Sequence, residues 1–375
     1  MIGWARVKLR DLYEVHNGLS KSRKFFGHGH PFLTFSTVFN HFFLPENLGS
    51  SVESTPEEQL SFSIKRGDVF ITRTSETAEE LGMSAVALID YPQATYNGFC
   101  KRLRPISDCR ILPEYAGYVL RAPEFRTRFY GLAGSMTSRA SLRNDDLLEM
   151  DIPLPELSVQ RKVSKCLFNY ESAIDNARRQ IALLEEAAMR LYREWFVVNA
   201  DPKWEKKTFG TFAKVARGRV ITKATAHRGE VPVVAAGLSP AYFTEKANVK
   251  APSVTISASG ANAGYVWYHA NDIWASDCSY LSKNETPYVY FSYAFLKTHS
   301  AVLKGLQKGS AQPHVHGSDI EGISFFVPGD DLVRQYEMTV DPVFQKIGVN
   351  EKLITSLTEA RDRLLPKLMS GEIEV

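Results

Sequence analysis

The chain has few cysteines and no long apolar run, and these two shortages limit the kinds of protein it can be. Its four cysteines are spread over 375 residues without a Cys-x-x-Cys pair, which argues against a disulfide framework and a cysteine zinc site. No run approaches the ~18 apolar residues of a membrane helix, and the first residues include no apolar stretch typical of signal peptides. We therefore expect a cytoplasmic protein that does not bind a membrane.

The sequence also lacks the short motifs that mark common catalytic and cofactor sites. It contains no G-x-x-x-x-G-K-[ST], G-x-G-x-x-G, H-E-x-x-H or G-x-S-x-G motif, and no Pro-Pro pair with which to hold a flipped base. His28 with His30, and His314 with His316, have no cysteine or carboxylate set nearby at metal-ligand spacing. For these histidines we favour polar loop or DNA contacts over a metal. The prediction is a protein without catalytic, cofactor-binding or metal-binding residues.

The net charge of +3 is small and unevenly distributed. Residues 201–328 carry 14 basic and 9 acidic side chains, whereas residues 1–155 carry 18 of each. This bias is compatible with nucleic-acid binding, but many neutral soluble domains have a similar one.

A sustained heptad pattern dominates residues 152–196. After Pro153 and Pro155, apolar or small residues recur at alternating steps of four and three, the pattern of a coiled-coil helix. The seam consists of Val163, Leu167, Tyr170, Ile174, Ala177, Ile181, Leu184, Ala188, Leu191 and Trp195. A helix of about 40 residues would span roughly 60 Å. It therefore needs a partner of equal length to cover its seam.

A second heptad seam near the C-terminus supplies that partner. It begins at Val333 and matches the first seam at an offset of 173, so that Ile174 corresponds to Ile347 and Leu184 to Leu357. The positions are Val333, Tyr336, Val340, Val343, Ile347, Asn350, Ile354, Leu357, Arg361, Leu364 and Leu368. The two polar members, Asn350 and Arg361, are of the kind that fixes register at some cost in stability.

The blocks that precede the two helices resemble each other. Both contain alternating and β-branched runs separated by turn residues, and residues 113–130 have a helical pattern. The matched positions include Trp4 with Trp204, Val15 with Val215, Gly18 with Gly218, Cys100 with Cys278, Tyr118 with Tyr293, and the run VFITRTS with VTISASG. We therefore predict an α+β protein with an internal repeat.

The predicted boundaries are a first module at 1–151, a long helix at 152–200, a second module at 201–328 and a second long helix at 329–375. Because the second module lies between the helices, the chain can turn round and the helices can pair as an antiparallel coiled coil. Two α/β modules held on such a pair would form a ruler between two binding surfaces.

Polar loops at corresponding places in the two modules are the best candidate binding sites. Arg, Lys, Asn, Gln, Ser and Thr are the side chains that pair with phosphates and base edges. The candidate DNA-contacting residues are Lys21, Ser22, Arg23, Lys24, Arg73, Thr74, Ser75, Arg139, Arg143, Arg217, Arg219, Lys223, Ser259, Asn262, Lys308, Ser310, Gln312, His314 and His316. Each loop alone could be an ordinary hydrophilic loop. A similar scaffold carrying different polar loops favours recognition of two different half-sites.

The end of the first long helix carries an aromatic cluster. Tyr192, Trp195 and Phe196 could contact either another protein or the second module, and the sequence leaves both interpretations open.

The succession of these features resembles the specificity subunit of Type I restriction-modification systems. The resemblance rests on the run GSMTSRASLRNDDLLEMDIPLPELSVQRKV at 134–163, the helix end LYREWFV and the C-terminal segment RDRLLPKLMSGEIEV. In the second copy Pro328 and Gln335 are retained, but the Pro-x-Pro is lost and the glutamines align at 175 instead of 173. The order of module, helix, module, helix covers the whole chain.

This resemblance implies target-recognition domains that each read one half of a split, asymmetric site in double-stranded DNA. It implies helices that set the spacing, and partners comprising two methyltransferase subunits and the restriction/translocase subunits. S-adenosylmethionine, ATP and magnesium would then belong to those partners, and this chain would be non-catalytic. The alternatives are a coiled-coil protein-interaction scaffold that does not bind DNA, and an enzyme in its own right. The second requires catalytic residues that the sequence does not contain.

Overall fold

The computed structural model describes residues 4–73, 81–133, 142–309 and 313–374. It consists of two compact units, one formed by Met1–Ala173 with Leu357–Val375 and the other by Ile174–Ser356. Each unit holds one α/β body and a stretch of both long helices. Within the described residues, no helix is long and apolar enough to cross a membrane.

The first unit is built on a four-stranded antiparallel sheet in the order β2-β8-β5-β6 and a three-stranded sheet in the order β4-β3-β7, in which β3 and β7 are parallel. A short pair, β1 with β9, joins the two ends of the α/β body. The strands are β1 Arg6–Lys8, β2 Tyr13–Asn17, β3 Phe26–Leu33, β4 Ser51–Val52, β5 Val69–Thr72, β6 Ser84–Val86, β7 Thr95–Tyr96, β8 Cys100–Pro105 and β9 Asp151–Pro153. The helices are α1 Phe35–Asn40, α2 Pro56–Ser61, α3 Pro113–Val119, α4 Pro123–Ala133 and α5 Asn144–Leu148.

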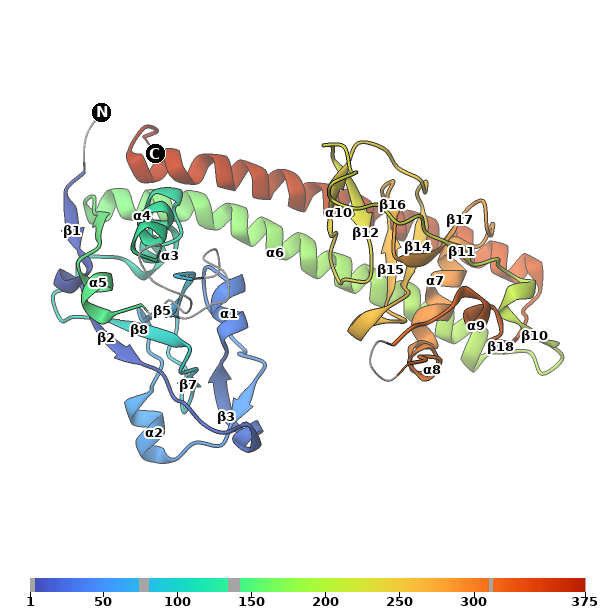
Figure 1. Ribbon diagram of the computed structural model, residues 1–375, viewed down its shortest axis with the longest axis horizontal. Helices are drawn as coiled ribbons and strands as arrows, with labels where there is room; N and C mark the ends of the chain where they lie inside the picture. Colours follow the sequence, from blue (N-terminus) through green and yellow to red (C-terminus); the bar gives the residue numbers. More distant parts are fainter. Residues whose placement is uncertain (1–3, 74–80, 134–141, 310–312, 375) are drawn as a thin grey trace. The chain divides into compact units, whose positions relative to one another are not determined.

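Burial in the first unit follows the apolar pattern of the sequence. Strand β5 is buried along its whole length because both of its edges are paired and both of its faces are covered. Helix α3 lies between this sheet and the long helix α6, Leu157–Arg193 (Figure 1). Its Tyr115 and Tyr118 pack in one core with Val163 and Leu368 of the long helices. The helical pattern at 113–130 is thereby confirmed as α3 and most of α4.

The second unit repeats this plan. Its sheets have the orders β11-β17-β14-β15 and β13-β12-β16, with β12 and β16 parallel, and β10 pairs with β18. The strands are β10 Lys206–Thr208, β11 Ala216–Arg217, β12 Val231–Val234, β13 Tyr242–Thr244, β14 Ser253–Ser257, β15 Val266–His269, β16 Trp274–Ala275, β17 Cys278–Ser282 and β18 Ser324–Phe326. The helices are α7 Val289–Thr298, α8 Ser300–Gly305 and α9 Gly317–Glu321.

The strand register pairs corresponding residues of the two units in the same way at several positions. Cys100 of β8 lies opposite Thr72 of β5, and Cys278 of β17 lies opposite Ser257 of β14 in the same way. The last residue of β2, Asn17, faces β8 at Lys101, and the last residue of β11, Arg217, faces β17. The match between VFITRTS and VTISASG is therefore confirmed over the strands that the structure describes.

Both predicted heptad seams are confirmed. Every position of the two seams is buried or half-buried. All but Trp195, which lies just beyond the end of α6, belong to α6 or to α10, Asp330–Ser370. In the second unit, the hydroxyl of Tyr336 donates to the carbonyl of Ala188 at 3.1 Å, and Asn350 Nδ2 donates to Gln180 Oε1 at 3.2 Å. Contacts therefore move backward along α10 as they move forward along α6, so the two helices pair antiparallel (Figure 1).

The aromatic cluster at the end of α6 belongs to the core of the second unit. A π-helical turn at Glu194–Val198 follows α6. The rings of Tyr192 and Phe196 pack against Phe291 of α7 at 5.3 and 4.9 Å between centroids, and both residues are buried. The interpretation that this cluster contacts the second module is correct, and the other, a surface for another protein, is wrong for these two rings.

Candidate nucleic-acid interface

Two of the predicted loops in the second unit come together at the end of β14. The backbone N–H of Val315 donates to the carbonyl of Ala258 at 3.0 Å, and that of Gly260 donates to Pro313 at 3.0 Å. Lys308 and His314 exchange two backbone hydrogen bonds of 2.9 and 2.8 Å. The predicted segments around Ser259 and His314 therefore form one continuous surface.

Arg217 belongs to the same surface through a shared carboxylate. Its Nη2 lies 2.5 Å from Asp277 Oδ1, and the hydroxyl of Ser259 donates to the other oxygen of Asp277. The arginine side chain is 54% exposed, so its guanidinium is oriented by Asp277 and remains accessible. Lys308, also exposed, pairs with Asp319 at 2.8 Å, and the His314 and His316 rings stack at 6.5 Å between centroids.

The remaining candidates in this unit differ in how firmly they are held. Arg219 is anchored through its backbone, because its N–H donates to Ala275 and its carbonyl accepts from Trp274 Nε1 at 2.8 Å. Its side chain and that of Lys223 are exposed, with no ion pair to any described residue. Asn262 ends a 3-10 turn, Gly260–Asn262, and is half-buried.

In the first unit the equivalent surface lies at the end of β5. The N–H of Leu142 donates to the carbonyl of Arg73 at 3.3 Å, as Val315 does to Ala258 in the second unit. Arg73 Nη1 donates to Asn17 Oδ1 at 3.4 Å. Arg143, at the start of α5, pairs with Asp146 at 2.8 Å and is largely exposed.

Residues 21–24 contact a different part of the first unit. Lys21 Nζ lies 2.6 Å from Glu58 and 2.7 Å from the carbonyl of Glu53, and it stacks over the Phe25 ring at 5.2 Å. Glu58 also accepts from the N–H of Thr55 in the capping box of α2. The hydrogen bond from Lys21, then that from Thr55, lower the pKa of Glu58. Lys21 thus anchors the loop, whereas Ser22, Arg23 and Lys24 are exposed on it.

Five predicted contact residues lie outside the described residues, and the structure places none of them. They are Thr74, Ser75, Arg139, Ser310 and Gln312.

Sequence reasoning missed a polar cluster next to Arg73. Lys101 is only 4% exposed, yet its Nζ donates to Asn17 Oδ1 at 3.3 Å and also to Asn144 Oδ1. Burial, and then the nearby Arg73, lower the pKa of Lys101. The strand Cys100–Pro105 gives no signal that two of its charged residues, Lys101 and Arg102, are buried, because CKRLRP places three basic residues on alternating and adjacent positions.

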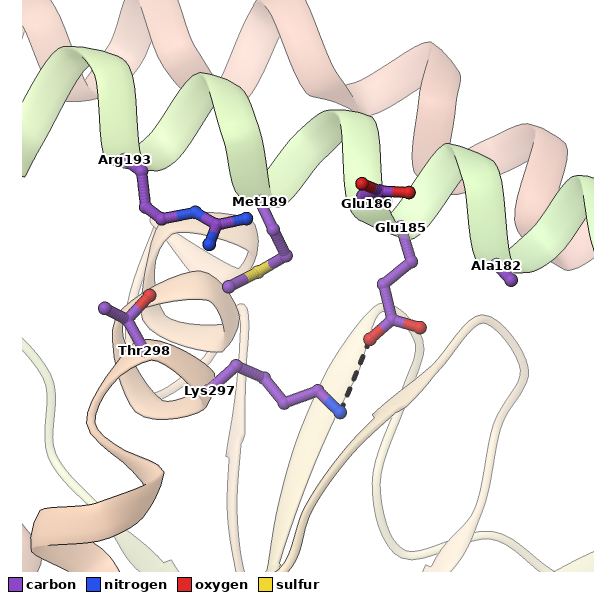
Figure 2. Close-up of a pocket in the computed structure, with 7 residues that line it drawn as sticks. All are labelled: Ala182, Glu185, Glu186, Met189, Arg193, Lys297 and Thr298. Atoms are coloured by element: carbon purple, nitrogen blue, oxygen red, sulfur yellow. Dashed lines mark ion pairs between the residues drawn. The ribbon is translucent and has the colours of Figure 1, made fainter. Parts of the chain in front are cut away.

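A separate pocket of about 490 Å³ lies between α6 and α7 in the second unit (Figure 2). Lys297 Nζ pairs with Glu185 at 3.4 Å across it, and the hydroxyl of Tyr293 donates to the same carboxylate oxygen. Met189, Arg193 and Thr298 line the pocket to one side of this pair. Because its central charges neutralise each other, this pocket fits a joint between helix and α/β body better than an anion-binding site.

A family model described as "Type I restriction modification DNA specificity domain" matches residues 1–186 and 202–358. The chain belongs to this family. The two matches contain the two α/β bodies, so the duplication seen in strand register is also a duplication of the specificity domain. The family resemblance inferred from the sequence is confirmed.

Proteins named as specificity subunits are similar to this chain over most of their length. The Type I restriction enzyme MjaIX specificity subunit of Methanocaldococcus jannaschii is 24% identical over 419 residues, covering 99% of this chain and 94% of that protein. The putative type I specificity subunit S.MgeORF438P of Mycoplasma genitalium is 23% identical over 278 residues, covering 70% of this chain and 72% of that protein. The crystal structure of a Type-I restriction-modification S subunit from M. genitalium is similar in fold, with a TM-score of 0.59, 17% identity, and coverage of 98% and 96%.

Proposed function

We propose that this specificity subunit binds double-stranded DNA and that each α/β body reads one half of a split, asymmetric site. The observation that carries the proposal is a shared strand framework with different polar side chains at one equivalent edge. That edge presents Asn17 and Arg73 in the first unit, and Arg217 on Asp277 in the second, where Ser259 is buried and donates to the same carboxylate. Equal frames with unequal donors and acceptors suit the reading of two unequal sequences.

The proposed contacts divide into two kinds. Exposed basic side chains such as Lys24 and Lys223 would contact phosphates, which position the protein without reading sequence. Side chains held by neighbours, such as Arg217 on Asp277, would reach base edges, since a fixed orientation is needed to discriminate between bases.

The long helices α6 and α10 would set the spacing between the half-sites and carry the other subunits. Those partners would be two methyltransferase subunits and, in a full restriction complex, the restriction/translocase subunits. In this proposal the chain itself is non-catalytic and binds no cofactor, and S-adenosylmethionine, ATP and magnesium act on the partners. The family description, which names a DNA specificity domain, supports this division of roles.

The experiment that tests the proposal is methylation mapping by single-molecule sequencing. DNA from cells carrying this chain with its cognate methyltransferase subunit is compared with DNA from the same cells lacking this chain. The expected result is a split motif, methylated once on each strand, that appears only with the chain. No new methylation, while the same methyltransferase subunit is active with another specificity chain, would contradict the proposal and favour a protein-interaction scaffold.

A further inference from the structure

We propose that Asn17 determines specificity in the first α/β body by donating a hydrogen bond to a guanine edge, and that Lys101 is the positioning residue that makes Asn17 a donor only. The inference rests on the proposed function, and it assigns one recognition position within it. Asn17 is the last residue of β2 and is exposed, whereas Lys101 lies directly opposite it on β8 and is buried.

The backbone of Asn17 is fixed from two sides. The hydroxyl of Tyr96 donates to the Asn17 carbonyl at 2.9 Å, and Tyr96 is fully buried. The next residue, Gly18, lies so close to Asn97 that an added Cβ would be 2.1 Å from its carbonyl oxygen. The side chain of Asn17 therefore projects from a rigid position, which is what discrimination between bases requires.

The amide of Asn17 is oriented by two cations. Lys101 Nζ lies 3.3 Å and Arg73 Nη1 lies 3.4 Å from its Oδ1. Lysine and arginine have donors only, so the opposite amide orientation would place an N–H₂ group against both of them. The network thus consumes Oδ1 and leaves Nδ2, for which no described residue supplies an acceptor.

Burial of Lys101 is consistent with a positioning role. A lysine that is 4% exposed loses hydration, and burial lowers its pKa. Among the described residues it has no carboxylate partner, only the amide oxygens of Asn17 and Asn144. The orientation of these two amides is what the buried ammonium group provides.

A donor-only asparagine selects a different base from an ordinary one. Asparagine usually pairs with adenine by accepting from N6 and donating to N7, which needs both ends of the amide. With Oδ1 occupied, Asn17 can satisfy only acceptors. Guanine presents two, O6 and N7, and no donor on that edge, and the positive charges of Arg73 and Lys101 favour it further.

The second α/β body supports this assignment independently. The residue equivalent to Asn17 is Arg217, also the last residue of its strand and also paired with β17 as Asn17 is with β8. Arginine is a donor by nature, and Asp277 orients it at 2.5 Å. Both bodies therefore present a fixed donor at the same place, built from different residues.

The test is methylation mapping with the full chain and its methyltransferase subunit, comparing wild type, Asn17→Asp and the matched control Asn47→Asp. Asn47 is exposed in the same unit, and its Oδ1 accepts from the N–H of Gly49, a role that aspartate preserves. Wild type should show a guanine in one half-site. Asn17→Asp replaces the donor with an acceptor. The variant should therefore no longer prefer guanine at that position, and methylation of the original motif should fall about tenfold or more.

Several outcomes would overturn the inference. They are an unchanged motif with Asn17→Asp, an equal effect of Asn47→Asp, or a change in both half-sites. If wild type itself directs no methylation, the proposed function fails. If wild type directs methylation but Asn17→Asp leaves the motif unchanged, only this inference fails, so the two failures are distinguishable.

Lys101→Met separates positioning from a merely structural role. It removes one of the two donors to Asn17 Oδ1 and leaves only the Arg73 contact, so one lone pair can accept a hydrogen bond from N6 of adenine. Adenine should therefore now be accepted at the same position while the other half-site stays as it was. A lower melting temperature with an unchanged motif would show that Lys101 serves only the fold, and would overturn its assignment as a positioning residue.

Discussion

Nη1 of Arg361 lies 2.5 Å from Oε1 of Glu171, and the two side chains are only 14% and 16% exposed. Arg361 stands in the seam of α10, where the heptad pattern calls for an apolar residue, and its guanidinium also stacks over the Phe42 ring at 5.0 Å. Glu171 of α6 therefore neutralises the arginine inside the helix pair. Arg361 interrupts the apolar pattern of the seam, but it forms a specific contact between α10 and α6.

Removing one partner of this pair should be costly. Arg361→Met keeps the aliphatic packing but leaves the Glu171 carboxylate shielded from water without its ion partner, and we expect a loss of about 3 kcal/mol in unfolding free energy. Denaturant unfolding measures it. Arg361→Met with Glu171→Leu should recover most of the loss. Arg363→Met, which removes an 82% exposed side chain from the same helix, should change little. Equal effects of Arg361→Met and Arg363→Met would contradict the prediction.

Asn350 should reduce stability in the second unit. It is 1% exposed, and its Oδ1 has no hydrogen-bond partner among the residues that the structure describes, although its Nδ2 donates to Gln180. An unsatisfied buried acceptor costs about 1–3 kcal/mol, so Asn350→Leu should raise the unfolding free energy by about 1 kcal/mol. Asn350→Ala, which leaves a cavity, serves as the comparison. A Leu variant that is less stable than wild type would show that the amide contributes to stability and would contradict the prediction.

Glu337 should make the stability of the second unit depend on pH. Burial raises its pKa from 4.5 to about 7, although the backbone N–H groups of Phe291 and Tyr290 oppose the shift. A raised pKa means that the folded state holds a proton that the unfolded state has released between pH ~4.5 and ~7. Stability therefore falls as pH rises through that window, by on the order of 3 kcal/mol in total.

Glu337→Gln tests this pH dependence. Glutamine keeps an acceptor for the Phe291 N–H, which lies 2.6 Å from the carboxylate in the wild type, and it does not titrate. The variant should be more stable than wild type at pH 8, similar to it near pH 4.5, and nearly independent of pH between them. Chemical unfolding at a series of pH values measures both. A variant that retains the wild-type slope would assign the dependence to another group.

Lys308 should make a contribution to DNA affinity that weakens as the salt concentration rises. Its Nζ pairs with Asp319 at 2.8 Å and the side chain is 64% exposed beside the His314 loop. Lys308→Ala should weaken binding severalfold and reduce the slope of log K against log salt by about 1. Lys250→Ala is the matched control, because Lys250 pairs with Asp272 at 2.7 Å but lies before β14 instead of after it. Equal effects of the two variants would remove Lys308 from the interface.

Arg73→Ala should weaken DNA binding without unfolding the first unit. Its side chain is half-buried and its contact to Asn17 is at the surface, so the fold loses little. The melting temperature checks the fold and a titration at fixed salt checks affinity. Wild-type affinity would remove Arg73 from the proposed contacts.

The parts of the fold that follow from periodicity were predictable from the sequence. The two seams repeat over ten or more positions, so a few polar members such as Asn350 did not obscure them. The site was less accessible. Lys101 and Asn17 are distant in sequence, and only the register of β2 against β8 brings them together. In the same way, the carboxylates that hold Lys21 and Arg217 become visible only once strands and loops are paired.

Lengthening both helices together should lengthen the spacer in the recognised DNA. We propose insertion of three heptads after Ala173 in α6 and three after Ser356 in α10. Each heptad preserves the seam, and 21 residues add roughly 31 Å at ~1.5 Å per residue. That is close to the ~34–36 Å of one turn of DNA, so each α/β body would meet the same face of the duplex again.

Methylation mapping should show both half-sites unchanged and a spacer longer by about nine base pairs at ~3.4 Å each. A single inserted heptad adds only about three base pairs and rotates the second half-site away, so it should give much less methylation. An altered half-site, or an unaltered spacer in the three-heptad variant, would contradict the role of the helices as a ruler.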